Sequence, residues 1–539
     1  MRARPGKAAI FEQFAVDDIR YMFGNPGTVE QGFLDAGSGA ATDYILALHE
    51  SVAVGMADGY ARAARRPALV QLHSGVGLGN GIGMLYQAMR GHTPLVVLVG
   101  EAGVRYDAMD AQMAADLVGM AEPVTKYATR VIDPSSVLRV LRRATKIAMT
   151  PPCGPVMVVL PADVLDQVTT EPALPTPLPE TRTAPEPELT AQAARLLLGG
   201  SKPLILMGDG VAAAGAQEQL RAVAEALGAP VWGVNSSEVN FDTTHPLYGG
   251  QLGHMFGADS ARVVAEADRV LIVGTYVFPE VFSSLHSPFR DDARIVHIDL
   301  DTYEIAKNFP VDLGIAADPR PTLAGLRAEL ERRSPHLAVA APPAPPGEGR
   351  PTARASRDPV LDGFVRHLAE RAPEGLVVFD EALTAGAPLT RYLPPRTPGR
   401  FFQTRGGSLG VGIPGAMGVK LARPELPVVG FSGDGASMYT FQALWTAARH
   451  GIDAKFVVCN NGRYRLLDHN IEQYWRQMGL PSHAAPRAFD LSRPAIRFTE
   501  LAGALGVAGR RVERTEHIEE AVAAMWAHPG PFLVDLVID

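Results

Sequence analysis

Residues 426–462, LPVVGFSGDGASMYTFQALWTAARHGIDAKFVVCNNG, decide the fold class of this chain. The apolar run LPVVGF leads into residues 432–435, SGDG, and the apolar run AKFVVC leads into residues 460–462, NNG. A segment of helix length separates the two runs. Because parallel strands need a long crossover connection, usually a helix, this stretch predicts two neighbouring parallel strands joined by a helix.

The same pattern recurs along the chain. It is found in PALVQLHSGVGLGN (67–80) and PLVVLVG (94–100), in KPLILMGDG (202–210), RVLIVGTYV (269–277) and ARIVHIDLD (293–301), and in GLVVFDE (375–381) and PFLVDLVID (531–539). Continuous apolar runs alternating with helix-length segments are typical of parallel sheets covered by helices on both faces. We therefore predict an α/β protein of three open parallel-sheet domains of related topology.

Two proline-rich stretches mark the expected domain boundaries. Residues 171–188 and 335–357 contain many prolines and little apolar periodicity. Since proline favours extended chain, both are predicted to be semi-rigid linkers. They separate expected domains at 1–170, 189–334 and 358–539, each of ordinary domain size.

Composition restricts the class of protein. The chain has 539 residues, 47% hydrophobic and 20% charged, which is typical of a soluble globular protein. The formal net charge of −8 argues against nucleic acid or an anionic membrane as the main partner. Cys153 and Cys459 are the only cysteines, so no disulfide framework is expected. No apolar run reaches the length of a membrane span or a signal peptide, and we expect a cytoplasmic enzyme.

Two oxygen-bearing side chains follow neighbouring strands in the opening stretch. Asp434 and Asn461 are one strand–helix–strand crossover apart, so they are expected about 5 Å apart at one sheet edge. A carboxylate and an amide oxygen suit Mg²⁺, which completes its shell with phosphate oxygens and water. Gly435 permits close backbone approach, and a helix beginning near Ala436 offers amide groups to an anion. Either tripeptide alone is typical of a turn; their paired placement favours a metal–diphosphate site.

Longer segments carry a family resemblance. Residues 433–464 and 405–425 resemble the cofactor-binding region of thiamine diphosphate-dependent enzymes of the pyruvate oxidase and acetolactate synthase superfamily. FGNPGTVEQGFL (23–34), YILALHESVAVGMADGYARA (44–63) and LHSGVGLGNGIG (72–83) are similar to the pyrimidine-binding domain of the benzoylformate decarboxylases within it. The resemblance implies pyrimidine-binding, central and diphosphate-binding domains in that order.

The resemblance also implies a set of cofactor ligands. Mg²⁺ would be bound by Asp434, Asn461 and the main-chain oxygen of Arg463. Thiamine diphosphate would be contacted by Glu50, Thr384, Gly407, Leu409, Asp434, Gly435, Ala436, Asn461 and Tyr464. Leu409 resembles an apolar wedge that bends the cofactor, although ordinary core packing is the alternative. Thr384 lies in DEALTAG, which departs from the hydroxyl-rich pattern of the family. FAD is not expected.

Three residues are expected to carry the acid–base chemistry. By resemblance, Glu50 hydrogen-bonds the aminopyrimidine ring and favours its imino form; the alternative is a first-turn glutamate stabilised by the helix dipole. His73 matches a proton-relay histidine, and the ordinary imidazole pKa near 6.5 suits that role. Thr28 stands where the decarboxylases carry a serine that contacts the substrate carboxylate. His92 is assigned to structure, as a turn residue before a strand.

The substrate pocket is expected to include Thr28, His73, Val281, Leu466 and Asn470. Val281 occupies the position of a second family histidine, with His286 five residues later, so the second proton relay is in doubt. Asn470 is more polar than an aryl pocket requires, and the substrate need not be benzoylformate.

The expected activity is Mg²⁺-dependent decarboxylation of a 2-oxo acid by addition of the thiazolium C2 ylide, with or without carboligation. The alternatives are an acetolactate-synthase-like transferase with or without FAD, and a non-catalytic thiamine diphosphate-binding protein. A pyruvate-decarboxylase-like enzyme is disfavoured because no adjacent His-His pair occurs, and a Rossmann dehydrogenase because the first strand–helix turn lacks G-x-G-x-x-G. Family resemblance implies a homodimer or homotetramer with active sites at the subunit interface.

Overall fold

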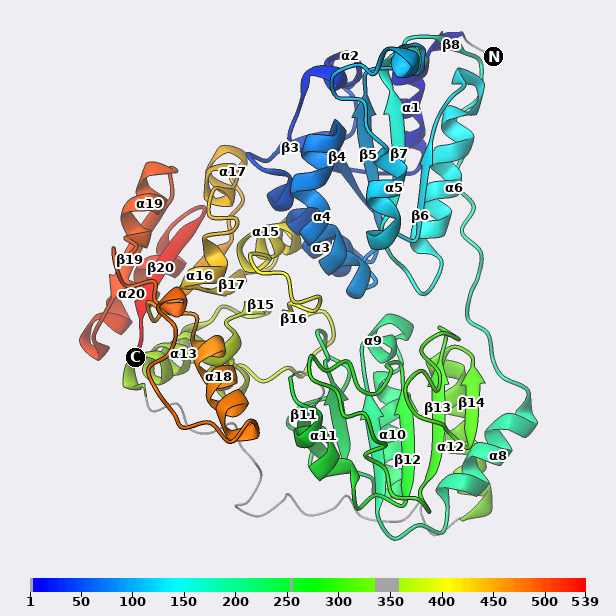
Figure 1. Cartoon of the computed structure of the whole chain (residues 1–539), viewed down its shortest axis with the longest axis vertical. Helices are drawn as coiled ribbons and strands as arrows, with labels where there is room; N and C mark the ends of the chain where they lie inside the picture. Colours follow the sequence, from blue (N-terminus) through cyan, green and yellow to red (C-terminus); the bar gives the residue numbers. More distant parts are fainter. Residues whose placement is uncertain (1–2, 253–254, 335–357) are drawn as a thin grey trace. The chain divides into compact units, whose positions relative to one another are not determined.

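The computed structural model describes residues 3–252, 255–334 and 358–539 (Figure 1). Three six-stranded sheets dominate it, which confirms the predicted α/β class with open parallel-sheet domains. A small antiparallel sheet also pairs β1 (Arg4–Pro5) with β8 (Val168–Thr169). The predicted linker at 335–357 lies outside the described residues, and residues 171–186 form no helix or strand.

The N-terminal sheet has the strand order β3-β2-β4-β5-β7-β6. Its strands are β2 (Tyr21–Gly24), β3 (Asp43–Leu46), β4 (Ala68–His73), β5 (Leu95–Glu101), β6 (Tyr127–Arg130) and β7 (Val156–Pro161). The main helices are α1 (Gly6–Val16), α3 (Glu50–Ala64), α4 (Ser74–Arg90) and α6 (Val137–Met149). All of β5 is buried, since the apolar strand is covered on both faces.

The C-terminal sheet has the order β16-β15-β17-β18-β20-β19. Its strands are β15 (Val377–Glu381), β16 (Phe401–Gln403), β17 (Val428–Gly433), β18 (Lys455–Asn460), β19 (Ala508–Val512) and β20 (Phe532–Val537). The helices are α13 (Pro359–Arg371), α14 (Gly386–Tyr392), α15 (Gly412–Ala422), α16 (Asp434–Ser437), α17 (Ala443–His450), α18 (Arg465–Gln477), α19 (Phe498–Ala504) and α20 (Ile518–Ala527). Counted in chain order within each sheet, the N-terminal and C-terminal sheets share the order 2-1-3-4-6-5.

The central sheet is arranged differently and lies in a second compact unit, which also includes β16; the first unit holds the N-terminal sheet and the rest of the C-terminal sheet. Its order, β11-β10-β9-β12-β13-β14, is 3-2-1-4-5-6 in chain order. The strands are β9 (Pro203–Met207), β10 (Val231–Val234), β11 (Tyr248–Leu252), β12 (Arg269–Val273), β13 (Arg294–Asp299) and β14 (Leu313–Ala316). Its helices are α8 (Pro187–Leu197), α9 (Gly210–Ala214), α10 (Gln217–Leu227), α11 (Gly257–Val264) and α12 (Pro319–Arg333).

Helices α3 and α15 cross in backbone contact within the first unit. A Cβ atom on Gly59 would lie 2.1 Å from the Gly415 carbonyl oxygen, and one on Gly418 would lie 2.0 Å from the Met56 carbonyl oxygen. Only glycine allows so close an approach. Glu50 begins the first of these helices, and the residues just before Gly412 lead into the second.

Among the helices of the described ranges, none combines the length and apolar character that crossing a bilayer requires.

Candidate functional site

Glu50 lies at the carboxyl edge of the N-terminal sheet, as the first residue of α3, and is 4% exposed. The Asn25 side-chain amide donates to its Oε1 (3.2 Å), and the Asn80 amide donates to its Oε2 (3.0 Å). Asn25 follows β2 and Asn80 lies on α4. Both oxygens of the buried carboxylate are therefore oriented by side-chain amides from two other elements.

His73 ends β4 and is held by a residue that the sequence analysis missed, Glu30. The His73 Nδ1 lies 2.9 Å from Glu30 Oε2, which also accepts the Gly27 N–H (3.1 Å). A Cβ atom on Gly27 would lie 2.0 Å from the His73 ring, so only glycine leaves room for the imidazole. Burial raises the pKa of Glu30, while His73 opposes this rise. The signal for Glu30 was its place three residues after Gly27, which fits a helix-capping glutamate equally well.

Glu30 and Glu50 both lie close enough to Tyr44 to affect it. Burial and the charges of both carboxylates raise the pKa of Tyr44, whose hydroxyl donates to Gln71 (2.5 Å). Thr28 begins the short 3₁₀ turn Thr28–Glu30 at the same edge and is exposed. This edge thus collects two buried carboxylates, an imidazole and a hydroxyl, which are groups that transfer protons.

Asp434 lies at the carboxyl edge of the C-terminal sheet and is 3% exposed. Its Oδ1 accepts the Gly435 N–H (2.7 Å), and its Oδ2 accepts the Gly462 N–H (2.6 Å). Asn461 follows β18, the strand paired with β17, and its Oδ1 accepts the Arg463 N–H (3.0 Å). Burial raises the pKa of Asp434, while the backbone N–H groups oppose the rise. The structure therefore brings the Asp434 turn and the Asn461 loop into direct contact.

The donor set at this edge fits Mg²⁺ and a diphosphate. A carboxylate, an amide oxygen and main-chain carbonyls are hard oxygen ligands. A Cβ atom built on Gly433 would meet nothing within 4 Å, so the backbone is open there to a group of atoms. Ala436 is buried in α16, and Tyr464, hydrogen-bonded to Tyr439, packs against Gly435. Across the described residues no cluster of three or more His, Cys, Asp or Glu could bind a metal, so an ion here depends on amide and backbone oxygens.

The segment between β16 and α15 carries Gly407 and Leu409. Gly407 and Gly410 adopt φ values of +79° and +97°, and Leu409 between them is half-buried. A second residue missed by the sequence analysis, Glu381, ends β15 and receives three backbone N–H groups from the residues after Leu409. Burial raises the pKa of Glu381 to about 7, against the opposing effect of these hydrogen bonds.

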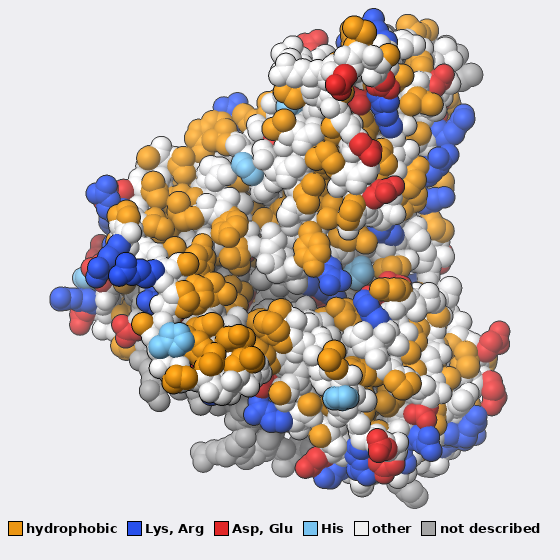
Figure 2. Space-filling model, viewed as in Figure 1, with side chains coloured by type: hydrophobic (Ala, Val, Ile, Leu, Met, Phe, Trp, Pro, Cys, Tyr) orange, Lys and Arg blue, Asp and Glu red, His pale blue; other side chains and the backbone are white. Residues whose placement is uncertain are grey.

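The remaining predicted residues lie on three separate elements. Thr384 is half-buried in the 3₁₀ turn Leu383–Ala385 after β15. Leu466 and Asn470 are one helical turn apart on α18 and are both half-buried. Val281 belongs to the central unit and is 64% exposed. Hydrophobic side chains gather over the region of α16–α18 (Figure 2), where Met438, Tyr439 and Leu467 are exposed.

The switch point of the central sheet lies between β9 and β12, where two glycine turns approach each other closely. A Cβ atom on Gly210 would lie 2.5 Å from Gly274 Cα, so the two glycine turns pack on each other. Asp209 accepts hydrogen bonds from Ser237 and Asn240 and pairs with Arg405. Although burial raises it, Arg405 and Ser237 bring the pKa of Asp209 below its usual value.

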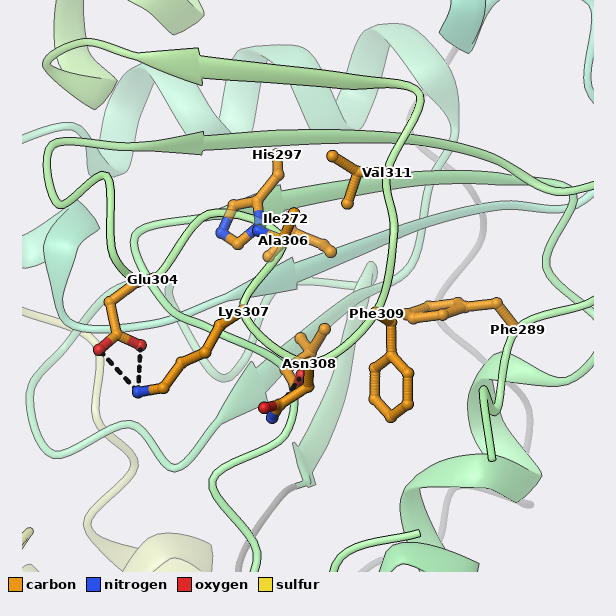
Figure 3. A pocket seen from close by; sticks show the side chains of 10 residues that line it. Ile272, Phe289, His297, Glu304, Ala306, Lys307, Asn308, Phe309 and Val311 are labelled. Atoms are coloured by element: carbon orange, nitrogen blue, oxygen red, sulfur yellow. Dashed lines mark hydrogen bonds and ion pairs between the residues drawn. The ribbon is translucent and has the colours of Figure 1, made fainter. Parts of the chain in front are cut away.

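A small hollow, without room for even a water-sized group, also lies in the central unit (Figure 3). The Lys307 ammonium pairs with Glu304 (3.0 Å) and lies over the rings of Tyr276 and Tyr303. Burial lowers the pKa of His297 to about 4, and its Nε2 lies 2.9 Å from the Thr275 carbonyl oxygen. Ligand pockets are usually larger than this and less completely paired internally.

Comparisons with known proteins agree with this arrangement. Residues 4–120, 190–326 and 385–536 match the N-terminal, central and C-terminal domain models of thiamine pyrophosphate enzymes. Benzoylformate decarboxylase from Pseudomonas aeruginosa is 30% identical, with 98% of each chain covered. Acetolactate synthase from Mycobacterium bovis is 29% identical, covering 92% of this chain and 81% of the relative. The solved thiamine diphosphate-dependent 4-hydroxybenzoylformate decarboxylase of Rhodococcus jostii is 26% identical, with 99% of each chain covered and a TM-score of 0.87.

Proposed function

Because this chain belongs to the thiamine pyrophosphate enzyme family, we propose that it catalyses the thiamine diphosphate- and Mg²⁺-dependent decarboxylation of a 2-oxo acid. The observation that carries this proposal is the His73 imidazole held by buried Glu30 at the same edge as Glu50. A decarboxylase must deliver a proton to the carbon that loses CO₂. A histidine oriented by a buried carboxylate is suited to that delivery.

The C-terminal edge would hold the cofactor. Asp434, Asn461 and the Arg463 carbonyl would bind Mg²⁺, and the backbone of Gly435 and Ala436 would face the diphosphate, with Thr384 and Tyr464 beside it. When bound, thiamine diphosphate supplies a thiazolium ring that adds to the substrate carbonyl and accepts the electron pair left as CO₂ departs. Gly407 and Leu409 would orient its pyrimidine ring.

The N-terminal edge would move the protons. Asn25 and Asn80 fix the Glu50 carboxyl so that it can share a proton with the pyrimidine ring. In this proposal the Nδ1–H group of His73 donates a hydrogen bond to Glu30, and Nε2 is left to exchange a proton with the substrate. Thr28 and Leu466 would bound the substrate, with Asn470 as a further pocket residue.

An acetolactate-synthase-like transfer is the second candidate, because relatives of that name are 29% identical. Such an enzyme would condense the decarboxylated fragment with a second 2-oxo acid instead of protonating it. We propose that FAD is not required; a yellow preparation would contradict this.

The test is a screen of 2-oxo acids, including pyruvate and benzoylformate, with thiamine diphosphate and Mg²⁺ added to the purified protein. We expect CO₂ release with a stoichiometric aldehyde, and no activity when EDTA removes the metal. Acetolactate or a related condensation product in place of the aldehyde would favour the transferase. Absence of CO₂ from every acid would contradict both functions.

We further propose that the working enzyme is a cytoplasmic homodimer or homotetramer whose active sites lie between subunits. The exposed Met438, Tyr439 and Leu467 near the C-terminal edge, and Val76 and Tyr86 on α4, are apolar surfaces suited to a second copy. Sedimentation at decreasing concentration, read together with activity, tests this: activity should fall as the assembly dissociates.

A further inference from the structure

The carboxylate of Glu381 is the most completely satisfied buried charge near the C-terminal edge. The residue is 1% exposed. Its Oε1 accepts the N–H groups of Gly410 (2.8 Å) and Val411 (3.0 Å). Its Oε2 accepts the Gly412 N–H (2.9 Å) and the Ser432 hydroxyl (3.0 Å). Four donors therefore converge on one side chain. None of these four hydrogen bonds involves the Asp434 carboxylate or the Asn461 loop.

These contacts fix the end of a turn whose start is held by Gln87, whose Oε1 accepts the Gly406 N–H (2.6 Å). Gly407 and Gly410 both have positive φ, a conformation available to glycine at little cost but also easily lost. The Gly410 peptide is held on both sides: its N–H donates to Glu381, and its carbonyl accepts the Thr440 hydroxyl (2.6 Å). Leu409 is the residue immediately before this fixed point.

The contacts select a carboxyl group over an amide. Three of the partners are backbone N–H groups, which can only donate, so both side-chain oxygens must accept, whereas an amide turns its NH₂ donor toward at least one of them. The Ser432 hydroxyl can donate to an ionised carboxylate or accept from a protonated one. The N-terminus of α15, an eleven-residue helix beginning at Gly412, lies at the same point and favours negative charge.

We propose that Glu381 is a positioning residue that holds residues 407–410 in the conformation in which Leu409 and the Gly407 carbonyl can orient the cofactor. The statement that the turn orients the cofactor rests on the proposed function. The clamp, by which we mean the hydrogen bonds that hold Gly410, Val411 and Gly412 to Glu381, is independent of the proposed function. Glu381 acts through the turn and supplies no ligand to Mg²⁺ or the diphosphate, although its contact with Ser432 joins it to the residue two positions before Asp434.

The test compares Glu381→Gln with Glu171→Gln. Glu171, the first residue of the proline-rich stretch 171–188, is the control because it is also buried and accepts a backbone N–H, from Leu138 (3.0 Å), while it pairs with Arg142 (3.1 Å); both partners lie on α6 of the N-terminal domain. In cofactor-free protein, we expect amide hydrogen exchange in a peptide covering 406–412 to accelerate about tenfold in E381Q, the effect of losing one or two buried hydrogen bonds, and to stay unchanged in E171Q. Unchanged exchange in E381Q would overturn the clamp.

A second readout separates positioning from simple stabilisation. In protein saturated with thiamine diphosphate and Mg²⁺, the deuterium exchange rate of the cofactor C2 proton should fall about tenfold in E381Q, while the affinity for the cofactor changes less than about threefold. If affinity falls in step with C2 exchange, or C2 exchange stays at the wild-type rate, the positioning role is wrong. Should the wild-type protein bind no thiamine diphosphate, the proposed function fails, and the amide exchange still decides the clamp. If E381Q does not fold, Ser432→Ala, which removes one donor, must show the same two changes at smaller size.

Discussion

The N-terminal and C-terminal sheets have the same strand order, but different kinds of group hydrogen-bond to the buried carboxylates at their carboxyl edges. At the N-terminal edge, Glu50 and Glu30 are held mainly by side chains, the amides of Asn25 and Asn80 and the imidazole of His73. At the C-terminal edge, the carboxylates of Glu381 and Asp434 are held mainly by backbone N–H groups.

This difference corresponds to two different roles for sheets of the same topology. Ligands of such sheets bind beyond the carboxyl ends of the strands, at the point where the strand order reverses. Side-chain partners such as imidazole can take up and release protons near neutral pH, whereas a backbone N–H does not titrate. The N-terminal edge is therefore suited to proton transfer, and the C-terminal edge to shaping a rigid binding surface. Substitutions at the first should change rates, and substitutions at the second should change loop shape and stability.

The largest effect is expected for Glu50→Gln. The amide keeps the shape of the carboxyl group but cannot share a proton, so kcat should fall by about 10²–10⁴ at equal cofactor occupancy. Steady-state kinetics on the best 2-oxo acid measures it. The control is Glu12→Gln, an exposed glutamate of α1 that pairs with Arg4 (2.7 Å) and should change kcat less than about threefold. An E50Q protein with wild-type kcat would support the non-catalytic alternative.

At the C-terminal edge, the pH dependence of stability should report Glu381. Burial raises its folded pKa to about 7 from an ordinary 4.5, so the folded protein binds the proton more tightly than the unfolded chain. The wild type should therefore be most stable relative to E381Q below pH 4.5. It should lose up to about 3 kcal/mol of that difference as the pH rises through 7. Urea unfolding of cofactor-free protein from pH 4.5 to 8 measures this. Ser432→Ala, which keeps the carboxyl group, should retain the slope, and a pH-independent difference for E381Q would refute the assignment.

Glu30→Gln is the third test and addresses the N-terminal edge again. The glutamine carbonyl can still accept the His73 Nδ1 proton, but the negative charge that stabilises a protonated imidazole is lost. We expect kcat to fall about 10- to 100-fold with KM nearly unchanged, because the interaction strengthens only when the ring is protonated. Glu12→Gln, at the exposed partner of Arg4, serves as the control. A fall in thermal stability with kcat preserved would make Glu30 a structural residue.

The local sequence pattern led to the candidate site residues that directly follow the apolar runs of predicted strands. Asp434, Asn461 and His73 stand beside glycines after apolar runs, and Glu50 follows the apolar run of residues 44–48, so local pattern locates them. Glu30, Glu381 and Asn80 were missed because their partners come from distant segments: the Glu381 side chain contacts residues 29 to 31 positions away. A glutamate that ends an apolar run has no local sign of that partnership.

The strand orders illustrate the same limit. All three domains show the same alternation of strand and helix, and this sufficed to predict open parallel sheets. The central sheet nevertheless has the order 3-2-1-4-5-6 where the other two have 2-1-3-4-6-5. The order depends on which edge each new strand joins, and the non-local packing of the helices decides that, not the local periodicity.

The smallest predicted effect concerns strain at the C-terminal edge. Leu383, next to Thr384, has a φ of +48° and is 39% exposed, so a non-glycine residue adopts a left-handed conformation with little burial to offset it. Such a conformation costs about 1–2 kcal/mol, of which glycine's greater freedom in the unfolded chain cancels part. Leu383→Gly should therefore raise the free energy of unfolding of cofactor-free protein by about 0.5 kcal/mol. Leu501→Gly, at an equally exposed leucine with helical backbone in α19, should lower it by about 1 kcal/mol. Urea unfolding of both variants decides the matter, since equal destabilisation would show that Leu383 is unstrained. Strained backbone is common at sites that bind ligands. A gain in stability from L383G would show such strain at the C-terminal edge, which we assign to cofactor binding.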